Sequence, residues 1–328
     1  TPGLESARRA GARWLAYTAN WPELTPDRLI CTAGAQQALA AAVMALCRPS
    51  DALIAEAASF YGVKMLAAQM GLKLVGAQMD AEGLTPEGLA RAARDSGAKV
   101  AYVLPLQNPT SRLMGAQRRR EIADTARRLN LTLVEDDIYA AQATALGLQP
   151  LAVLAPERTF YVSSLSKALA PGLRVGYLVP PPGVWFDRCQ DALRTIAFGP
   201  PTFGGMVAAD WIERGEAFEI AQAVNTELTR RADLARSILG PAMEPIARPI
   251  ASHVWLPLSE LDAERVAGQA LRGGVETTAP RPPFLDGAPV TGLRICLGAP
   301  ADLAELGAGL EILRAALDPA TRSASSIV

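Results

Sequence analysis

With 328 residues, the chain exceeds the size at which one hydrophobic core usually stops growing, about 250–300 residues, so we expect a large domain and a smaller one. Its formal net charge of −1 indicates no basic surface, and we expect no nucleic acid to bind through this chain itself. The longest apolar run, residues 38–47, is shorter than the ~18 residues needed to span a bilayer, so we expect no membrane segment.

Several classes of site are excluded by residues that the sequence lacks. His253 is the only histidine, which argues against a histidine-based triad or a multi-histidine metal site. No glycine precedes a lysine and no GxGxxG occurs, so the nucleotide-binding fingerprints are missing. We expect no metal and a reducing, cytoplasmic setting, because the cysteines are scattered without a CxxC pair. They are Cys31, Cys47, Cys189 and Cys296.

In chain order, an amphipathic helix at residues 4–18 comes first, and we expect it to pack with the smaller domain or to bridge the two. From residue 28 to about 180, short apolar runs alternate with helical patterns, which is typical of a mainly parallel sheet. Strands are predicted at residues 28–32, 52–56, 72–77, 100–104, 131–135, 159–163 and 174–179. Helices between them are predicted at residues 35–47, 60–70, 86–96 and 116–129.

A Gly/Pro-rich passage at residues 199–205 precedes a helix-rich stretch that runs to about residue 239. Short strands near residues 252–258 and 293–297, with helices between and after them, predict a small α+β domain. We therefore divide the chain into three parts. These are an N-terminal helix associated with the small domain at 1–27, a large α/β domain at 28–205 and the small domain at 206–328.

Polar motifs follow several predicted strands, and ligands of open α/β sheets bind at the carboxyl ends of strands. The motifs are Gln107-Asn108-Pro109-Thr110, Asp136-Asp137-Ile138-Tyr139 and Ser164-Leu165-Ser166-Lys167. An earlier strand ends in Ala33-Gly34-Ala35-Gln36, which opens a helix whose free N–H groups and dipole favour an anion. A phosphate, a ring and a reactive lysine fit together at such an edge.

In order and spacing, these motifs resemble the pyridoxal-5′-phosphate (PLP)-dependent aminotransferases of fold type I. Within that family, the sequence is most similar to the aminotransferase-like domain of MocR/GntR-type bacterial regulators. The match extends from Gly11-Ala12-Arg13-Trp14-Leu15 to Leu293-Arg294-Ile295-Cys296-Leu297-Gly298 and includes Pro171-Gly172-Leu173-Arg174 after the lysine motif. The resemblance implies an α/β fold type I structure with a mainly parallel sheet and a small α+β domain, PLP as cofactor, and a homodimer.

The resemblance also implies the roles at the reacting end of the cofactor. Lys167 would hold PLP through a Schiff base, and a cationic, partly buried setting would favour the reactive amine. Asp136 would pair with the ring nitrogen, in preference to Asp137, because the acid of the family stands three residues before the tyrosine, here Tyr139. Asn108 and Tyr139 would donate hydrogen bonds to the ring hydroxyl oxygen.

The same resemblance implies a phosphate site on Ser164, Ser166, Arg174 and the N–H groups of Gly34 and Ala35. Phe60 takes the place of the aromatic residue that stacks on the ring, and Arg294 that of the binder of the substrate α-carboxylate. Asn108 is expected to bind the substrate as well.

Each residue also has a purely structural interpretation. Gly34-Ala35 can form an ordinary strand-to-helix turn, Asn108 a turn and Asp136 a helix cap. Phe60 can belong to the core, and Arg294 can be a structural salt-bridge partner. Only the ordered set of motifs around Lys167 favours the cofactor site.

The sequence departs from the family pattern in two places. Ser111 replaces the glycine that often follows Asn-Pro-Thr in working aminotransferases, and Glu56-Ala57-Ala58-Ser59-Phe60 replaces the usual turn before the stacking aromatic. The chain begins with Thr1 rather than methionine, which is typical of a fragment of a longer product.

Two functions therefore stay open. The favoured one is the amino-acid-sensing, PLP-binding domain of a transcription regulator whose DNA-binding part lies outside this chain. The alternative is a free-standing aminotransferase that transfers an amino group from an amino acid to a 2-oxo acid. In both cases the small-molecule partner is an amino acid.

Overall fold

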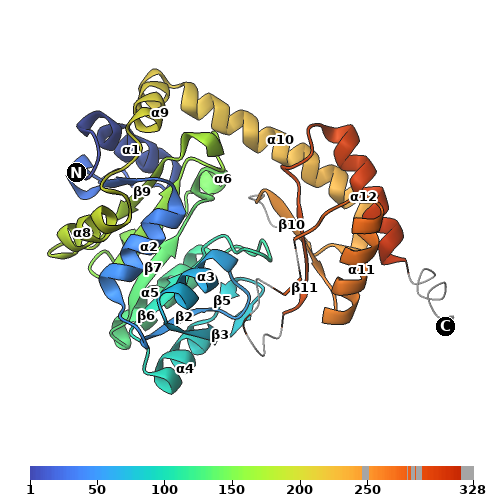
Figure 1. Cartoon of the computed structure of the whole chain (residues 1–328), viewed down its shortest axis with the longest axis horizontal. Helices are drawn as coiled ribbons and strands as arrows, with labels where there is room; N and C mark the ends of the chain where they lie inside the picture. Colours follow the sequence, from blue (N-terminus) through green and yellow to red (C-terminus); the bar gives the residue numbers. More distant parts are fainter. Residues whose placement is uncertain (246–250, 279, 282–284, 286–289, 319–328) are drawn as a thin grey trace.

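The computed structural model describes residues 1–245, 251–278, 280–281, 285 and 290–318. Its centre is a seven-stranded sheet in the order β1-β9-β8-β7-β6-β2-β3 (Figure 1). The strands are β1 (Ile30–Thr32), β2 (Ala52–Glu56), β3 (Lys73–Ala77), β6 (Val100–Val103), β7 (Thr132–Asp136), β8 (Thr159–Ser164) and β9 (Gly176–Val179). Strand β9 runs antiparallel to the other strands of this sheet, which all point the same way. The expected α/β class with a mainly parallel sheet is confirmed.

Helices cover both faces of this sheet, because successive side chains of each strand point to opposite faces. The helices are α1 (Glu5–Thr18), α2 (Ala35–Leu46), α3 (Tyr61–Gln69), α4 (Pro86–Ser96), α5 (Ala116–Arg128), α6 (Ala140–Ala143), α7 (Leu151–Leu154), α8 (Trp185–Ala197), α9 (Thr202–Arg214), α10 (Glu216–Leu239), α11 (Glu260–Arg272) and α12 (Leu303–Leu317). One face, with Tyr102, Val134 and Phe160, packs against α2, α3 and α8. The opposite face packs against α4, α5 and α7 at one end and against α1, α6 and α9 at the other.

The smaller unit is built on an antiparallel pair, β10 (His253–Pro257) and β11 (Gly292–Cys296). Leu293 and Ile295 of β11 pack with α10, α11 and α12 in an apolar cluster of their own. The long helix α10 runs from α9, beside the large sheet, to this smaller unit (Figure 1). A large and a small unit are thus confirmed, whereas their expected boundaries in the chain stay predictions.

The N-terminal helix α1 packs against α9 and against the sheet, where it shares an apolar cluster with Tyr161 and Tyr177. Gly11 permits the close approach, since a Cβ there would lie 2.6 Å from the Tyr177 ring. In Figure 1, α1 lies on the opposite side of the molecule from β10 and β11. Its neighbours are therefore the sheet and α9, which begins in the passage between the two predicted domains.

Helix α8 and the hairpin of β4 (Met79–Asp80) and β5 (Gly83–Leu84) were not expected from the sequence. Helix α8 starts at Trp185, shortly after the prolines at 180–182. Its buried residues Cys189, Ala192 and Leu193 have helical spacing and pack on the sheet. Within the described residues, no helix is long and apolar enough to cross a membrane.

Candidate cofactor-binding site

The sheet brings the polar motifs to a single edge. Strands β1, β6, β7 and β8 all run in the same direction, so their carboxyl ends lie together. Asp136 is the last residue of β7 and Ser164 the last of β8, while Asn108 follows β6 and Gly34 follows β1. The residues that were expected to surround a cofactor therefore line one edge of the sheet.

An anion cradle lies where β1 leads into α2. Gly34 has a φ of 91°, and Arg174 is also left-handed, with a φ of 52°. Arg174 Nη2 donates to the carbonyl oxygen of Ala33 at 2.9 Å. A Cβ at Gly34 would lie 2.8 Å from this Nη2, so glycine is needed for the guanidinium to lie there. Together with the N–H of Ala35 in the first turn of α2, the guanidinium can bind a phosphate.

One oxygen of the Asp136 carboxylate accepts a hydrogen bond from a side chain and the other does not. Oδ2 accepts a hydrogen bond from Tyr102 Oη at 2.7 Å, whereas the buried Oδ1 has no partner within the described residues. Burial raises the pKa of Asp136 to about 7, and the bond from Tyr102 opposes the rise. Because an unpaired buried carboxylate oxygen is costly, Oδ1 is a place where a cationic N–H donor would be held strongly.

Sheet alternation separates Asp136 from Asp137. Asp136 follows Val134 by two residues and so belongs to the face covered by α2, whose first turn forms the cradle. Asp137 accepts from Tyr161 Oη at 3.2 Å, and Tyr161 packs on the opposite face. Only Asp136 shares a face with the anion cradle, in agreement with its predicted role.

Arg294 reaches from the smaller unit to the edge of the large sheet. Its Nη1 donates to Asn108 Oδ1 at 3.2 Å, and its Nε and Nη2 donate to Thr278 Oγ1 at 3.1 and 2.9 Å. Arg294 makes no ion pair within the residues that the structure describes. The guanidinium is therefore held by neutral acceptors, an arrangement open to a carboxylate ligand.

Tyr139 is likewise held from the smaller unit. Its hydroxyl lies 3.3 Å from Ser252 Oγ and 3.4 Å from His253 Nδ1. Burial raises the pKa of Tyr139, so the phenol keeps its proton as a donor. Burial also lowers the pKa of His253 to about 3, so the imidazole is neutral. The smaller unit thus contacts both residues that were expected to face the cofactor hydroxyl, Asn108 and Tyr139.

Ser111, the departure from the usual glycine, has a φ of 59° and so occupies the region that favours glycine. Its Oγ donates to the carbonyl oxygen of His253 at 3.1 Å. The serine therefore adopts a backbone conformation that is unfavourable for a residue with a Cβ, and it gains a hydrogen bond that joins the loop after β6 to β10.

Lys167 stands at this edge of the sheet but is exposed, so the partial burial expected for its amine is not provided by the single chain. Its carbonyl oxygen accepts from Gln142 Nε2 at 3.0 Å, and Ser164 Oγ accepts the N–H of Ser166 at 3.0 Å. Both contacts fix the backbone of the turn after β8. Phe60 is half-buried immediately before α3, with its ring 4.9 Å from that of Tyr61.

Comparison with known proteins assigns a family to this arrangement. The model of the family "Aminotransferase class I and II" matches residues 1–313. The chain belongs to this family. It is 28% identical over 302 residues to the uncharacterized HTH-type transcriptional regulator YdeF of Bacillus subtilis, covering 91% of this chain and 65% of that protein. It is 26% identical over 290 residues to a 2-aminoadipate transaminase of Thermus thermophilus, covering 85% of this chain and 73% of that one.

Among solved structures, an archaeal alanine:glyoxylate aminotransferase superposes with a TM-score of 0.87 at 24% identity, over 96% of this chain and 81% of that one. The predicted fold type I structure is thereby confirmed. The chain spans less than two-thirds of the length of the regulator YdeF.

PLP, the cofactor expected from the family, fits the residues of this site. The unpartnered Oδ1 of Asp136 would receive the ring N–H, and Arg174 with the first turn of α2 would hold the phosphate. When bound, PLP supplies an aldehyde carbon that links to amines and a ring that withdraws electrons. Lys167 has the amine at the same edge, and Asn108 and Tyr139 have the groups to contact the ring hydroxyl.

Three side chains of this site were not anticipated. Tyr102, Ser252 and Thr278 contact Asp136, Tyr139 and Arg294 respectively. Tyr102 lies within a predicted strand, and its link to Asp136 follows only from the neighbouring positions of β6 and β7. His253 was noted only as the single histidine, within a predicted strand, and its contact with Tyr139 depends on the packing of the two units.

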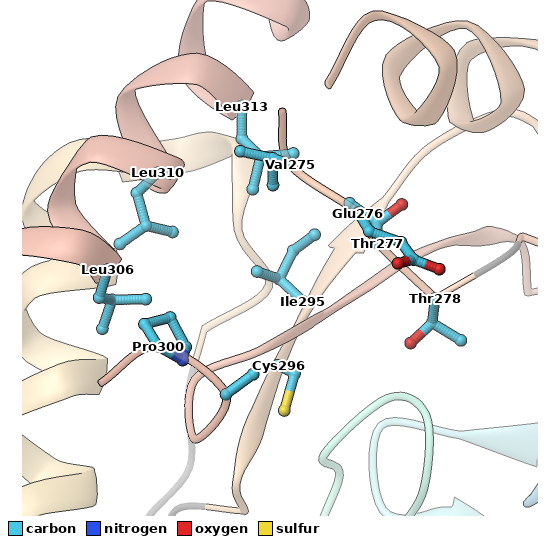
Figure 2. A pocket seen from close by; sticks show the side chains of 12 residues that line it. Val275, Glu276, Thr277, Thr278, Ile295, Cys296, Pro300, Leu306, Leu310 and Leu313 are labelled. Carbon is cyan, nitrogen blue, oxygen red and sulfur yellow. The ribbon is translucent and has the colours of Figure 1, made fainter. Parts of the chain in front are cut away.

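A separate hollow of about 480 Å³ lies between β11, α12 and residues 275–278 (Figure 2). Leu306, Leu310 and Leu313 of α12 form one wall, with Val275 and Ile295 nearby. Thr278 lines it as well and links it to Arg294. This mainly aliphatic lining does not suit a phosphate.

Proposed function

We propose that this chain is the PLP-binding, amino-acid-sensing domain of a MocR/GntR-type transcription regulator. One structural observation carries the sensing part: Arg294, which has no ion-pair partner within the described residues, donates to Asn108 across the two units. The regulatory part is supported by the similarity to YdeF over 91% of this chain. Contact with DNA is assigned to a further domain of the natural product, not to this chain.

Arg294 would bind the carboxylate of an amino acid, whose amine would replace that of Lys167 on the cofactor. A sensor needs only the resulting change in population between two conformations, because a ligand that binds one of them better shifts the equilibrium. Three contacts between the two units would transmit the change: Arg294 with Asn108, Ser252 with Tyr139, and Ser111 with the carbonyl oxygen of His253. They join β10 and β11 to the loops around Asn108 and Tyr139.

The alternative function is a free-standing aminotransferase, supported by the similarity to the 2-aminoadipate transaminase. The test is to mix the PLP-loaded protein with single amino acids and to follow its absorbance and the 2-oxo acid released. A sensor changes its spectrum with selected amino acids but turns over slowly or not at all. Sustained conversion with 2-oxoglutarate or pyruvate, at about 1 per second or faster, would contradict the sensor and support the enzyme.

The protein is further proposed to form a homodimer in a reducing, cytoplasmic setting. Large apolar side chains cluster in sequence where α8 passes into α9, with Phe198 90% and Phe203 81% exposed, and a second protomer would cover them. A second protomer would also supply the burial that Lys167 lacks here. Light scattering of the purified protein tests the dimer, and a monomeric mass would contradict it.

The free thiols of Cys31, Cys47, Cys189 and Cys296 suit a reducing compartment.

A further inference from the structure

The hydroxyl of Tyr102 is directed at the cofactor aspartate. Its ring is fully buried in the apolar cluster beneath α2, and Tyr102 Oη donates to Asp136 Oδ2 at 2.7 Å. The register of the parallel strands β6 and β7 places Tyr102 opposite Val134, so the side chain reaches forward to the residue that ends β7. The distance is that of a strong O–H···O bond to a carboxylate.

We propose that Tyr102 is a positioning residue for the cofactor: by holding Oδ2, it fixes the Asp136 carboxylate so that Oδ1 faces the ring nitrogen of PLP. The inference rests on the proposed PLP site and adds a residue outside all of its motifs. Without the hydroxyl, the carboxylate loses a donor that favours its ionised form and a contact that limits its rotation.

The other titratable groups near Asp136 cannot replace Tyr102. Glu56 of β2 accepts from the N–H of Leu104 at 2.9 Å and from Ser59 Oγ at 3.2 Å, and it has no hydrogen to donate when ionised. Asp137 adds negative charge that disfavours ionisation of Asp136. Tyr139 is directed toward Ser252 and His253.

The backbone N–H of Ile138 also favours the ionised form of Asp136. Tyr102 is therefore the side chain that favours the carboxylate by direct donation among the residues described around Asp136. Burial of Asp136 gives this one bond a large effect, because hydrogen bonds are stronger at low dielectric.

A matched pair of variants isolates this effect. Tyr102→Phe removes the hydroxyl that donates to Asp136, and Tyr161→Phe removes an equally buried hydroxyl that donates to Asp137 on the opposite face. Each cofactor-free protein is titrated by calorimetry with pyridoxine 5′-phosphate from pH 6 to 9. This probe lacks the aldehyde, so Lys167 does not react with it.

We expect Tyr102→Phe to bind the probe about tenfold more weakly at pH 7, from the loss of one hydrogen bond to a charged group. The pH below which its affinity falls should also move upward. Tyr161→Phe should stay within about twofold of the wild type, as expected for a change remote from the ligand. In an Asp136→Asn background, Tyr102→Phe should add no further loss. Wild-type behaviour of Tyr102→Phe, equal losses in both tyrosine variants or an undiminished loss with Asp136→Asn would each overturn the inference.

A spectroscopic measurement avoids dependence on the Tyr102 variant. With tyrosine labelled with 13C at Cζ, one buried resonance among the six tyrosines should shift both in Asp136→Asn and on addition of pyridoxine 5′-phosphate. The absence of either shift would contradict the role of Tyr102. Failure of the wild-type protein to bind the probe at all would instead overturn the PLP proposal, and this inference with it.

Discussion

Arg294 of the smaller unit donates a hydrogen bond to the side-chain oxygen of Asn108, which follows β6 of the large sheet, at 3.2 Å. A carboxylate that binds the guanidinium competes with this bond. Ligand binding at Arg294 of β11 would therefore change the hydrogen bonding of Asn108, a residue expected to contact the cofactor. Thr278 accepts the two remaining donors that the structure shows.

Arg294→Gln should retain PLP but weaken the response of its absorbance to amino acids by about 100-fold, since a charge-assisted bidentate contact is lost. Thr278→Val removes the acceptor of Nε and Nη2 without removing the charge, and should weaken the response by only about fivefold. Titrations with several amino acids measure both effects. An unchanged response in Arg294→Gln would show that the carboxylate binds elsewhere.

Lys167→Ala should abolish the covalent link to PLP that borohydride reduces, because no other lysine belongs to the motifs at this edge. Peptide mass mapping after reduction is the measurement, and the wild-type label should lie on the peptide with Lys167. A label on Lys64, Lys73 or Lys99 would refute the assignment.

Asp136 should make the cofactor-free protein less stable as the pH rises. Its pKa is raised to about 7 in the folded state from an ordinary value of 3.8, so the folded state binds this proton more tightly than the unfolded state. The stabilisation is therefore complete at low pH and is lost as the pH approaches 7, with a slope of about 1.4 kcal/mol per pH unit. The change is expected between about pH 5 and 6.5.

Denaturant unfolding of wild type and Asp136→Asn over this range tests the slope. The amide does not titrate, so the difference in free energy of unfolding between the two proteins should vary with pH. Glu56 also has a pKa raised to about 7, mainly by burial, which is the same in both proteins, so most of its contribution cancels; the charge of Asp136 is the smallest cause of that rise. Parallel curves would show that Asp136 is already ionised in the folded protein.

At Ser111, a hydrogen bond to the His253 carbonyl stabilises the fold, whereas the left-handed backbone conformation destabilises it. Two substitutions separate these effects. Ser111→Ala keeps the left-handed backbone but loses the bond to the His253 carbonyl, and should lower the free energy of unfolding by about 1 kcal/mol. Ser111→Gly loses the same bond but relieves the backbone cost, so it should lie within about 0.5 kcal/mol of the wild type. If the alanine and glycine variants were equally stable, the φ of 59° would carry no cost.

The strands of the large sheet and the polar residues at their ends could be predicted from the sequence, because apolar runs and the motifs after them are local signals. The sequence also favoured Asp136 over Asp137 by resemblance, and alternation along β7 supplies the physical reason. Local signals could not indicate that β6 lies beside β7 with Tyr102 two residues short of the carboxylate. They were also silent on Ser252 and Thr278, which belong to the other unit.

The exposure of Lys167 was not foreseen for a related reason. Burial of a side chain depends on every element packed around it, including any second protomer, and a motif describes only its own segment. Helix α8 was not predicted for the same kind of reason, because it is stabilised by Cys189 and Leu193 against the sheet rather than by a strong local start signal.

The adjacent carboxylates at the end of β7 also bear on how the chain reaches this fold. A slip of β7 by one residue turns its side chains to the other face. In one direction Ile138 would take the place of Asp137, so the hydroxyl of Tyr161 would lose its acceptor. In the other direction Val134 would take the place of Glu135, so the N–H groups of Leu151 and Ala152 would lose theirs. Each buried donor left unpaired costs about 1–3 kcal/mol. The three consecutive carboxylates thus mark the register of this strand. The side chains that prepare the site for its ligand also discriminate against misaligned sheets during folding.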